Sequence, residues 1–288
     1  MKIRIVSPAK HIEKEHVEYA VSWLENQSFE VEVGQFALGQ HHYFSGTEAE
    51  RLQDFQEALD DPTVDVILCA RGGYGSIQLI DRLDFKAFIE NPKFIVGYSD
   101  ITVFHNHVVR HYQSPTVHAT APLNFEENTG ESLESLLNVL NGGQNRYEFS
   151  SHTLNIEGEI KAQVVGGNLS ILYALIGTNS DADYRGKILF IEEIGEAIYA
   201  LDRMFYALKK SGKLAQISGL IVGGMTQMKD SHIPYGKTAE EVIKSHVQEL
   251  GIPVCFNFPA GHISDNRAIV LGKSARLTVR HDQVIFEQ

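Results

Sequence analysis

The chain has 288 residues, 43% of them hydrophobic and 22% charged, which is typical of a globular protein with a sizeable core. Its formal net charge is −12 and no cluster of lysines and arginines stands out, which argues against a nucleic-acid partner because phosphate binding needs a basic surface. We expect no membrane span, since no stretch reaches about 18 apolar residues. The amino terminus does not resemble a signal peptide, so the expected compartment is the cytoplasm.

The first part of the chain alternates short apolar runs with segments of helical periodicity. The sequence predicts strands at 2–6, 29–33, 64–70 and 94–97, and helices at 13–26, 47–59, 76–82, 84–90 and 100–112. The run 64–70 is almost continuously apolar, as expected for a strand that is covered on both faces. Strands that alternate with helices predict a doubly wound parallel sheet.

The pattern changes after about residue 124. Residues 125–160 are polar and irregular, and they are predicted to form a linker region with one helix near 131–140. The remaining residues predict strands at 187–193, 218–223 and 254–258, a GGN turn at 166–168, helices that end at Gly212 and Gly251, and a terminal hairpin within 275–287. We therefore expect an N-terminal α/β domain (1–124), the linker region, and a C-terminal mixed α/β domain (161–288) with some antiparallel strands.

A serine stands at the junction between the predicted strand 94–97 and the helix that follows it. Such a serine is either a helix cap or a nucleophile raised above the sheet by a tight strand-to-helix turn. Gly97 lies two residues before Ser99, as in a nucleophile elbow, but Ile101 takes the place of the second glycine. The motif by itself leaves both interpretations open.

The segment 71–76, Arg-Gly-Gly-Tyr-Gly-Ser, follows the buried strand 64–70. Its glycine amides could bind a phosphate or a developing oxyanion, although a plain turn between strand and helix is the alternative. The segment is neither a Walker A loop nor a G-x-G-x-x-G motif. It lies with Ser99 at the carboxyl ends of strands, where open α/β sheets bind ligands.

Two later segments place titratable side chains after apolar strands. Glu192 and Glu193 end a strand, and because successive side chains point to opposite faces, one should face a cleft. Two solvated carboxylates are the alternative, since a buried carboxylate is costly unless it is paired. His262 follows another strand in a glycine-containing loop, which is the kind of position that a base for Ser99 would need.

The other histidines and the cysteines predict no second site, and no metal or cofactor site is predicted. His107 and His111 are four residues apart on one helix, but no His-Glu-x-x-His motif is present, so we interpret them as surface or capping residues. His118, near the end of a probable strand, could line a cleft. Cys69 and Cys255 lie within apolar runs and are predicted to be buried thiols.

In combination, these segments resemble the LD-carboxypeptidase family of serine peptidases, which also contains the microcin C immunity proteins. The matching stretches are YFSGTEAER (43–51), CARGGYGSIQLI (69–80), FIVGYSDIT (94–102), VVGGNLS (164–170), ILFIEEIGEAIYALDRM (188–204) and PAGHISDNRAIVLG (259–272). They follow the family order over nearly the whole chain, which is more specific than any single motif.

The resemblance implies a serine carboxypeptidase with a Ser-Glu-His triad that spans two domains, to which Ser99, Glu192 and His262 correspond. It further implies an oxyanion hole made by the backbone of Gly73 and Asp100, and a homodimer. The residues expected to bind the substrate are Gly72, Tyr98 and Asn168.

Two activities compete within this family. LD-carboxypeptidases remove the terminal D-Ala from murein tetrapeptide during cytoplasmic cell-wall recycling, whereas the immunity proteins cleave an amide in a peptidyl-nucleotide, and their relatives can use an aromatic platform for the base. The only tryptophan here is Trp23, on an early helix, which favours the murein peptide.

Two other hypotheses remain. One is a non-catalytic protein that binds an anion at 71–76, and the other is a thiol enzyme built on Cys69, which is disfavoured because Cys69 lies within a strand. A carboxypeptidase also needs a positive group to receive the D-Ala carboxylate, and the motifs do not identify it.

Overall fold

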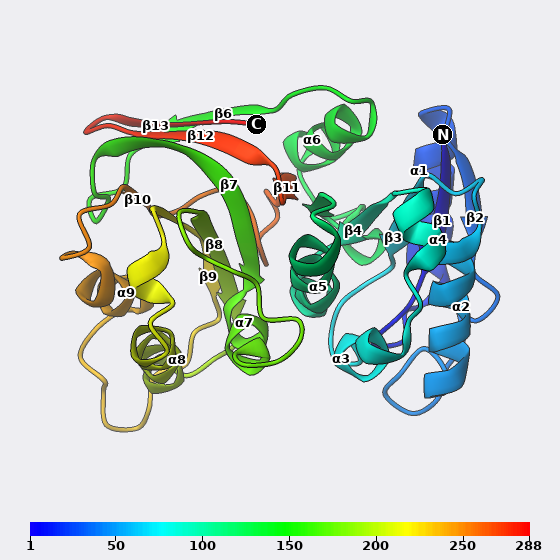
Figure 1. The fold of residues 1–288 in the computed structure, drawn as a ribbon, viewed down its shortest axis with the longest axis horizontal. Coiled ribbons are helices and arrows are strands. Elements are labelled where there is room, and N and C mark those ends of the chain that lie inside the picture. Colours follow the sequence, from blue (N-terminus) through cyan, green and yellow to red (C-terminus); the bar gives the residue numbers. More distant parts are fainter.

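A computed structural model describes residues 1–288, which form two sheets that lie side by side (Figure 1). The first sheet contains, in spatial order, β11 (Ile269–Leu271), β5 (Thr116–His118), β4 (Phe94–Gly97), β3 (Val66–Cys69), β1 (Lys2–Val6) and β2 (Glu30–Val33). The strands β1 to β5 are parallel, and β11 joins β5 antiparallel at one edge.

Helices cover both faces of the first sheet, as the sequence predicts. These helices are α1 (Lys14–Asn26), α2 (Glu48–Asp60), α3 (Ser76–Leu79), α4 (Lys86–Glu90) and α5 (Thr102–Tyr112). Successive residues of β3 serve the two faces: Val66 and Leu68 pack in the core that contains α1, while Ile67 and Cys69 pack with α2 and α5. A strand buried on both sides explains the continuous apolar run in the sequence.

The second sheet is mixed, which confirms the predicted mixed α/β character. Its spatial order is β10 (Val254–Cys255), β9 (Gly219–Thr226), β8 (Ile188–Ile194), β7 (Gly158–Asn168), β12 (Ser274–Val279), β13 (Gln283–Glu287) and β6 (Arg146–Ser150). β7 to β10 are parallel, whereas β12, β13 and β6 pair antiparallel and include the predicted terminal hairpin. The accompanying helices are α7 (Leu169–Leu175), α8 (Ile198–Lys210) and α9 (Ala239–Val247).

The structure contains three strands and one α-helix that the sequence did not predict, namely β6, β7, β11 and α7. The region 125–160 contains β6 of the second sheet as well as α6 (Gly130–Leu140), and β11 returns to the first sheet. The predicted turn at 166–168 is the end of β7, and Asn168 caps α7, because its side chain accepts a hydrogen bond from the Ile171 N–H. The boundaries of the two domains stay a prediction.

Helix α5 lies between the two sheets and ties them together (Figure 1). The Thr102 hydroxyl oxygen accepts a hydrogen bond from the Asn168 N–H at 2.9 Å, and the Asn106 amide donates to the Gly166 carbonyl at 3.1 Å. On the same helix, the His107 side chain is only 8% exposed, and its ring bonds the Ser180 hydroxyl. The interpretation of His107 as a surface or capping residue is therefore wrong. No helix combines the length and the apolar character needed to cross a membrane.

Candidate active site

The nucleophile candidate lies on a strained turn at the carboxyl end of β4. Ser99 has a φ of 64°, in the left-handed region that non-glycine residues rarely adopt, and it begins a short 3-10 helix, η2 (Ser99–Ile101), that runs into α5. A Cβ on Gly97 would lie 3.0 Å from Ile101, so the isoleucine that replaces the second glycine of the elbow packs directly on the first. Strain of about 1–3 kcal/mol at such a residue is typical of a functional turn.

Neither polar side chain of this turn caps the helix. No side-chain cap bond is formed at the start of η2 or of α5. The buried Asp100 carboxylate instead accepts a hydrogen bond from the Ser76 N–H at 2.8 Å, and burial raises the pKa of Asp100. Asp100 therefore joins the nucleophile turn to the glycine-rich loop, and the capping interpretation of Ser99 is not supported.

The glycine-rich loop approaches Ser99 through Gly72. A Cβ on Gly72 would lie 2.7 Å from the Ser99 Cβ and 3.1 Å from the Asp100 nitrogen, so only glycine fits there. The Cα of Gly73 faces Lys10 and Tyr43 instead, while its N–H donates to no group of the chain. The loop thus brings an open backbone donor close to the serine turn.

Gly72→Ala is expected to lower kcat/KM on the order of 10²-fold, because the added methyl group must displace Ser99 and such misplacement of a reacting group is costly. The matched control is Gly130→Ala, where a Cβ would meet nothing within 4 Å. Steady-state kinetics on both purified variants checks this result. Equal activity of the two variants would contradict the placement of Ser99 as the reacting group.

The acid candidate and the histidine form a buried pair on the second sheet. Glu192, at the end of β8, is fully buried, and its Oε2 lies 2.6 Å from the His262 Nδ1. The loop that carries the histidine is fixed by two further bonds: the Gly261 N–H donates to Asn266 at 2.8 Å, and the Thr226 hydroxyl donates to the His262 carbonyl at 3.2 Å. Because the Glu192 carboxylate accepts a hydrogen bond, the His262 Nδ1 is the donor of this pair, and Nε2 is left to act as a base.

Burial of the His262 ring acts to lower its pKa, but the charge and hydrogen bond of Glu192 outweigh burial and raise the pKa above its usual value. A raised pKa makes the imidazole a stronger base and stabilises the protonated form that arises after proton transfer.

The two halves of the site meet at Tyr98. The Tyr98 ring lies 4.9 Å from the His262 ring, centroid to centroid, and its hydroxyl donates to the Asn124 side chain at 2.6 Å. Tyr98 and Asn124 line a pocket of about 330 Å³ beside His262. The lining residues are Tyr98, Asn124, Glu127, Asn128, Ile194, Gln227, His262, Ile263 and Ser264. Residues from both halves of the chain therefore form this pocket.

The Glu193 carboxylate is bonded to groups other than His262. Its carboxylate accepts hydrogen bonds from the Asn168 amide at 3.1 Å and the Ser170 N–H at 2.7 Å. Burial raises the pKa of Glu193. Because Asn168 also caps α7, both ends of its amide have partners within the chain, and its role toward a substrate stays a prediction.

The remaining candidates lie in the core. His118 is completely buried, with its ring centroid 4.7 Å from that of Phe190, so the prediction that it lines the cleft is wrong. Cys69 and Cys255 are buried, as predicted, and burial raises the pKa of both thiols, which disfavours a thiolate nucleophile. Trp23 packs edge-on against Phe125, with ring centroids 5.4 Å apart.

Sequence reasoning missed three residues that position this site. Thr102 and Asn266 stand within the stretches GYSDIT and PAGHISDN, so attention to the polar residues beside each motif could have found them. Asn124 lies outside these stretches and gave no signal. No group of three His, Cys, Asp or Glu side chains is placed to hold a metal ion.

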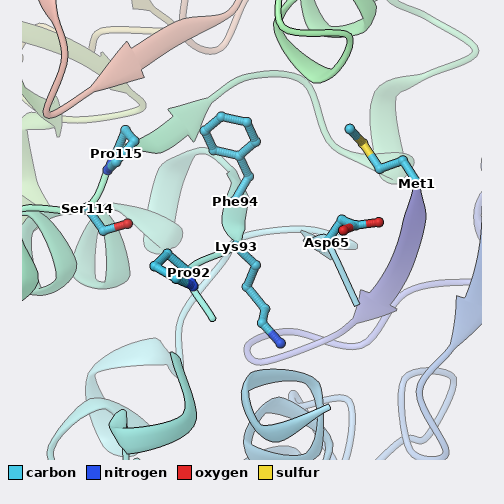
Figure 2. Close-up of a pocket in the computed structure, with 7 residues that line it drawn as sticks. All are labelled: Met1, Asp65, Pro92, Lys93, Phe94, Ser114 and Pro115. Atoms are coloured by element: carbon cyan, nitrogen blue, oxygen red, sulfur yellow. The ribbon is translucent and has the colours of Figure 1, made fainter. Parts of the chain in front are cut away.

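A second pocket, of about 270 Å³, lies where the parallel strands of the first sheet begin (Figure 2). Met1, Asp65, Lys93 and Pro115 line it, and each stands just before a parallel strand. The Lys93 ammonium points away from Pro115 and donates to the carbonyls of residues 58 and 61. Open α/β sheets bind ligands at the carboxyl ends of their strands, where Ser99 lies.

Comparison with known proteins finds similarity over both parts of the chain. Residues 3–119 match the model of the LD-carboxypeptidase N-terminal domain, and residues 161–277 match that of the LD-carboxypeptidase C-terminal domain. The chain is 28% identical to the murein tetrapeptide carboxypeptidase of Pseudomonas aeruginosa over 286 residues, which cover 96% of this chain and 92% of that protein.

Two further proteins are similar over most of their length. The microcin C7 self-immunity protein MccF of Escherichia coli is 27% identical over 301 residues, covering 92% of this chain and 86% of that protein. The crystal structure of muramoyltetrapeptide carboxypeptidase from Oxalobacter formigenes superposes with a TM-score of 0.91 at 25% identity, covering 100% of this chain and 98% of that one. Both similarities extend over the two sheets and the site between them.

Proposed function

The chain belongs to the LD-carboxypeptidase family, and on that premise we propose that it releases the terminal D-Ala of murein tetrapeptide through a Ser-His-Glu acyl-enzyme mechanism. The protein is a serine carboxypeptidase. The observation that carries the finer proposal is the buried Glu192–His262 pair, which meets the residue before Ser99 across the two sheets. The proposal places the reaction in the cytoplasm and includes a homodimer.

In the acylation step, the Ser99 hydroxyl oxygen attacks the carbonyl carbon of the scissile amide while His262 Nε2 takes the hydroxyl proton. Glu192 keeps the ring oriented through Nδ1 and stabilises the imidazolium. The backbone amides of Gly73 and Asp100 are proposed to bind the oxyanion, and each such donor typically lowers the barrier by about 3–4 kcal/mol.

When the C–N bond breaks, the imidazolium gives its proton to the amine of the leaving D-Ala, and the peptide stays bound to Ser99 as an ester. A water molecule then attacks this ester and gives its proton to His262. The Ser99 oxygen takes the proton back as it leaves, so the enzyme returns to its starting state.

The murein peptide is preferred to a peptidyl-nucleotide because the pocket offers little aromatic surface for a base. Tyr98 is the only aromatic residue of the lining apart from His262, and Trp23, on α1, packs against Phe125. The rest of the lining is mainly polar, which suits a peptide that carries amides and charges.

An assay of two substrates side by side tests this function. The purified enzyme is given murein tetrapeptide, with diaminopimelate or lysine at the third position, and a peptidyl-nucleotide amide. We expect D-Ala release from a tetrapeptide with a kcat/KM at least about tenfold above that for the nucleotide amide. Turnover of the nucleotide amide alone would reject the proposal, and light scattering of the same sample tests the dimer.

A further inference from the structure

A carboxypeptidase must recognise the free carboxylate at the end of its substrate. Moving a carboxylate out of water costs much free energy unless the carboxylate is paired. The site should therefore supply a positive group. The pocket beside His262 contains no lysine or arginine. Two cations are candidates: Arg71, which begins the glycine-rich loop, and Lys10, in the loop after β1.

Arg71 stands directly before Gly72, the residue whose Cα lies against Ser99. One nitrogen of its guanidinium, Nη1, donates to the His11 carbonyl at 3.0 Å, which fixes the side chain beside the loop after β1. The Nε atom is buried without a partner, whereas Nη2 is neither buried nor bonded within the chain. The guanidinium therefore keeps an open donor, and it belongs to the residue directly before Gly72.

The charge of Arg71 is not neutralised by the protein. None of the ion pairs of the structure includes Arg71, although the chain has 37 acidic and 25 basic residues. The positive charge of this half-buried arginine is therefore free to pair with an external anion.

The charge of Arg71 acts on a residue of the pocket. Burial and the negative charge of Glu192 raise the pKa of Tyr98, and the positive charge of Arg71 opposes them. The same phenol meets Asn124 and lines the pocket beside His262. An anion bound by Arg71 would thus lie near the reacting groups.

Lys10 is less suited to this role. Its stem packs against Gly73, and its ammonium lies 5.2 Å from the centroid of the Tyr43 ring. An ammonium is also a point charge, whereas a guanidinium offers parallel N–H groups that match the two oxygens of a carboxylate.

We propose that Arg71 binds the terminal carboxylate of the substrate, which belongs to the leaving D-amino acid, and so selects a free carboxyl end. This inference rests on the proposed function and adds a specificity residue to it. The carboxylate accepts hydrogen bonds from Nη2 and from the second hydrogen of Nη1, while His11 holds the guanidinium in place.

The test compares two substrates in four proteins. The substrates are the tetrapeptide and the same peptide with a C-terminal D-Ala amide. The proteins are the wild type, Arg71→Gln, Lys10→Gln and, as a remote control, Arg280→Gln on the exposed hairpin turn. We measure kcat and KM for each combination and the melting temperature of each protein.

We expect Arg71→Gln to lower kcat/KM for the free acid roughly 10- to 150-fold, the range for a hydrogen bond to a charged group, mainly by raising KM. Its kcat/KM for the amide should change by less than about threefold, so the preference for the acid disappears. The Lys10 and Arg280 variants should keep the wild-type preference.

Equal losses on acid and amide would show that Arg71 only supports the fold, and the inference would be wrong. Loss of the preference in Lys10→Gln, with Arg71→Gln unchanged, would also overturn it. A wild-type enzyme that turns over neither peptide would instead reject the proposed function itself, before Arg71 is considered.

Discussion

Ser99→Ala is expected to lower kcat for D-Ala release roughly 10⁴- to 10⁶-fold, because removal of a nucleophile leaves only the contributions of binding and of the oxyanion donors. The fold should not change, since alanine and serine pay a similar penalty at the φ of 64°. Circular dichroism and thermal unfolding check the fold, and the rate of D-Ala release checks the chemistry. Mass spectrometry should also show that the variant no longer reacts with a serine-directed phosphonate.

Two variants serve as controls for this experiment. Ser22→Ala removes the hydroxyl of an exposed serine on α1 and should retain full activity. Cys69→Ser tests the thiol hypothesis, and its activity should stay near that of the wild type because the thiol is buried behind the turn. Substantial turnover by Ser99→Ala, or its loss in Cys69→Ser with the fold intact, would overturn the assignment of the nucleophile.

Glu192→Gln is expected to lower kcat by about 10⁴-fold, as for other enzymes in which the acid that orients a catalytic histidine becomes an amide. Only the neutral imidazole can accept the Ser99 proton, so the rate rises as the pH increases through the pKa of His262. Because Glu192 raises that pKa, the acid limb of kcat/KM in the wild type should lie above about pH 6.5.

In the variant, the burial that lowers the pKa of His262 is no longer opposed by Glu192, so the acid limb should move to lower pH. The matched control is Glu193→Gln. Glu193 contributes least to raising the pKa of His262, so its replacement should move the limb less and mainly lower the stability. If the residual rate is too small, the pKa of His262 can be followed by NMR. An unchanged pKa in Glu192→Gln would contradict the pairing.

Most regular elements were predictable from local patterns. The continuous apolar run at 64–70 corresponds to β3, and the helix predicted before Gly251 corresponds to α9, which begins with a capping box between Thr238 and Glu241. The strand β6 was missed because it alternates buried and exposed residues over only five positions within a polar region. Helix α7 was missed because it starts directly after β7, with Asn168 serving as the last residue of the strand and as the cap of the helix.

The sequence could name the candidate groups but not their surroundings. His107 and His118 looked accessible in the sequence, yet residues from the second half of the chain cover both: Ser180 bonds the His107 ring, and Phe190 packs against the His118 ring. Burial of this kind depends on what a distant segment places against a residue. Periodicity within one segment cannot reveal it.

By itself, the sequence determined the strand and helix pattern, the family resemblance and the turn that carries Ser99, since these depend on residues close together in the chain. Only the tertiary structure decided that Glu192 meets His262 from 70 positions away, that Gly72 contacts Ser99, and that Arg71 has no carboxylate partner. The physical reason is that hydrogen bonds, burial and charge pairing depend on distances in space. Packing of the two sheets around α5 sets those distances.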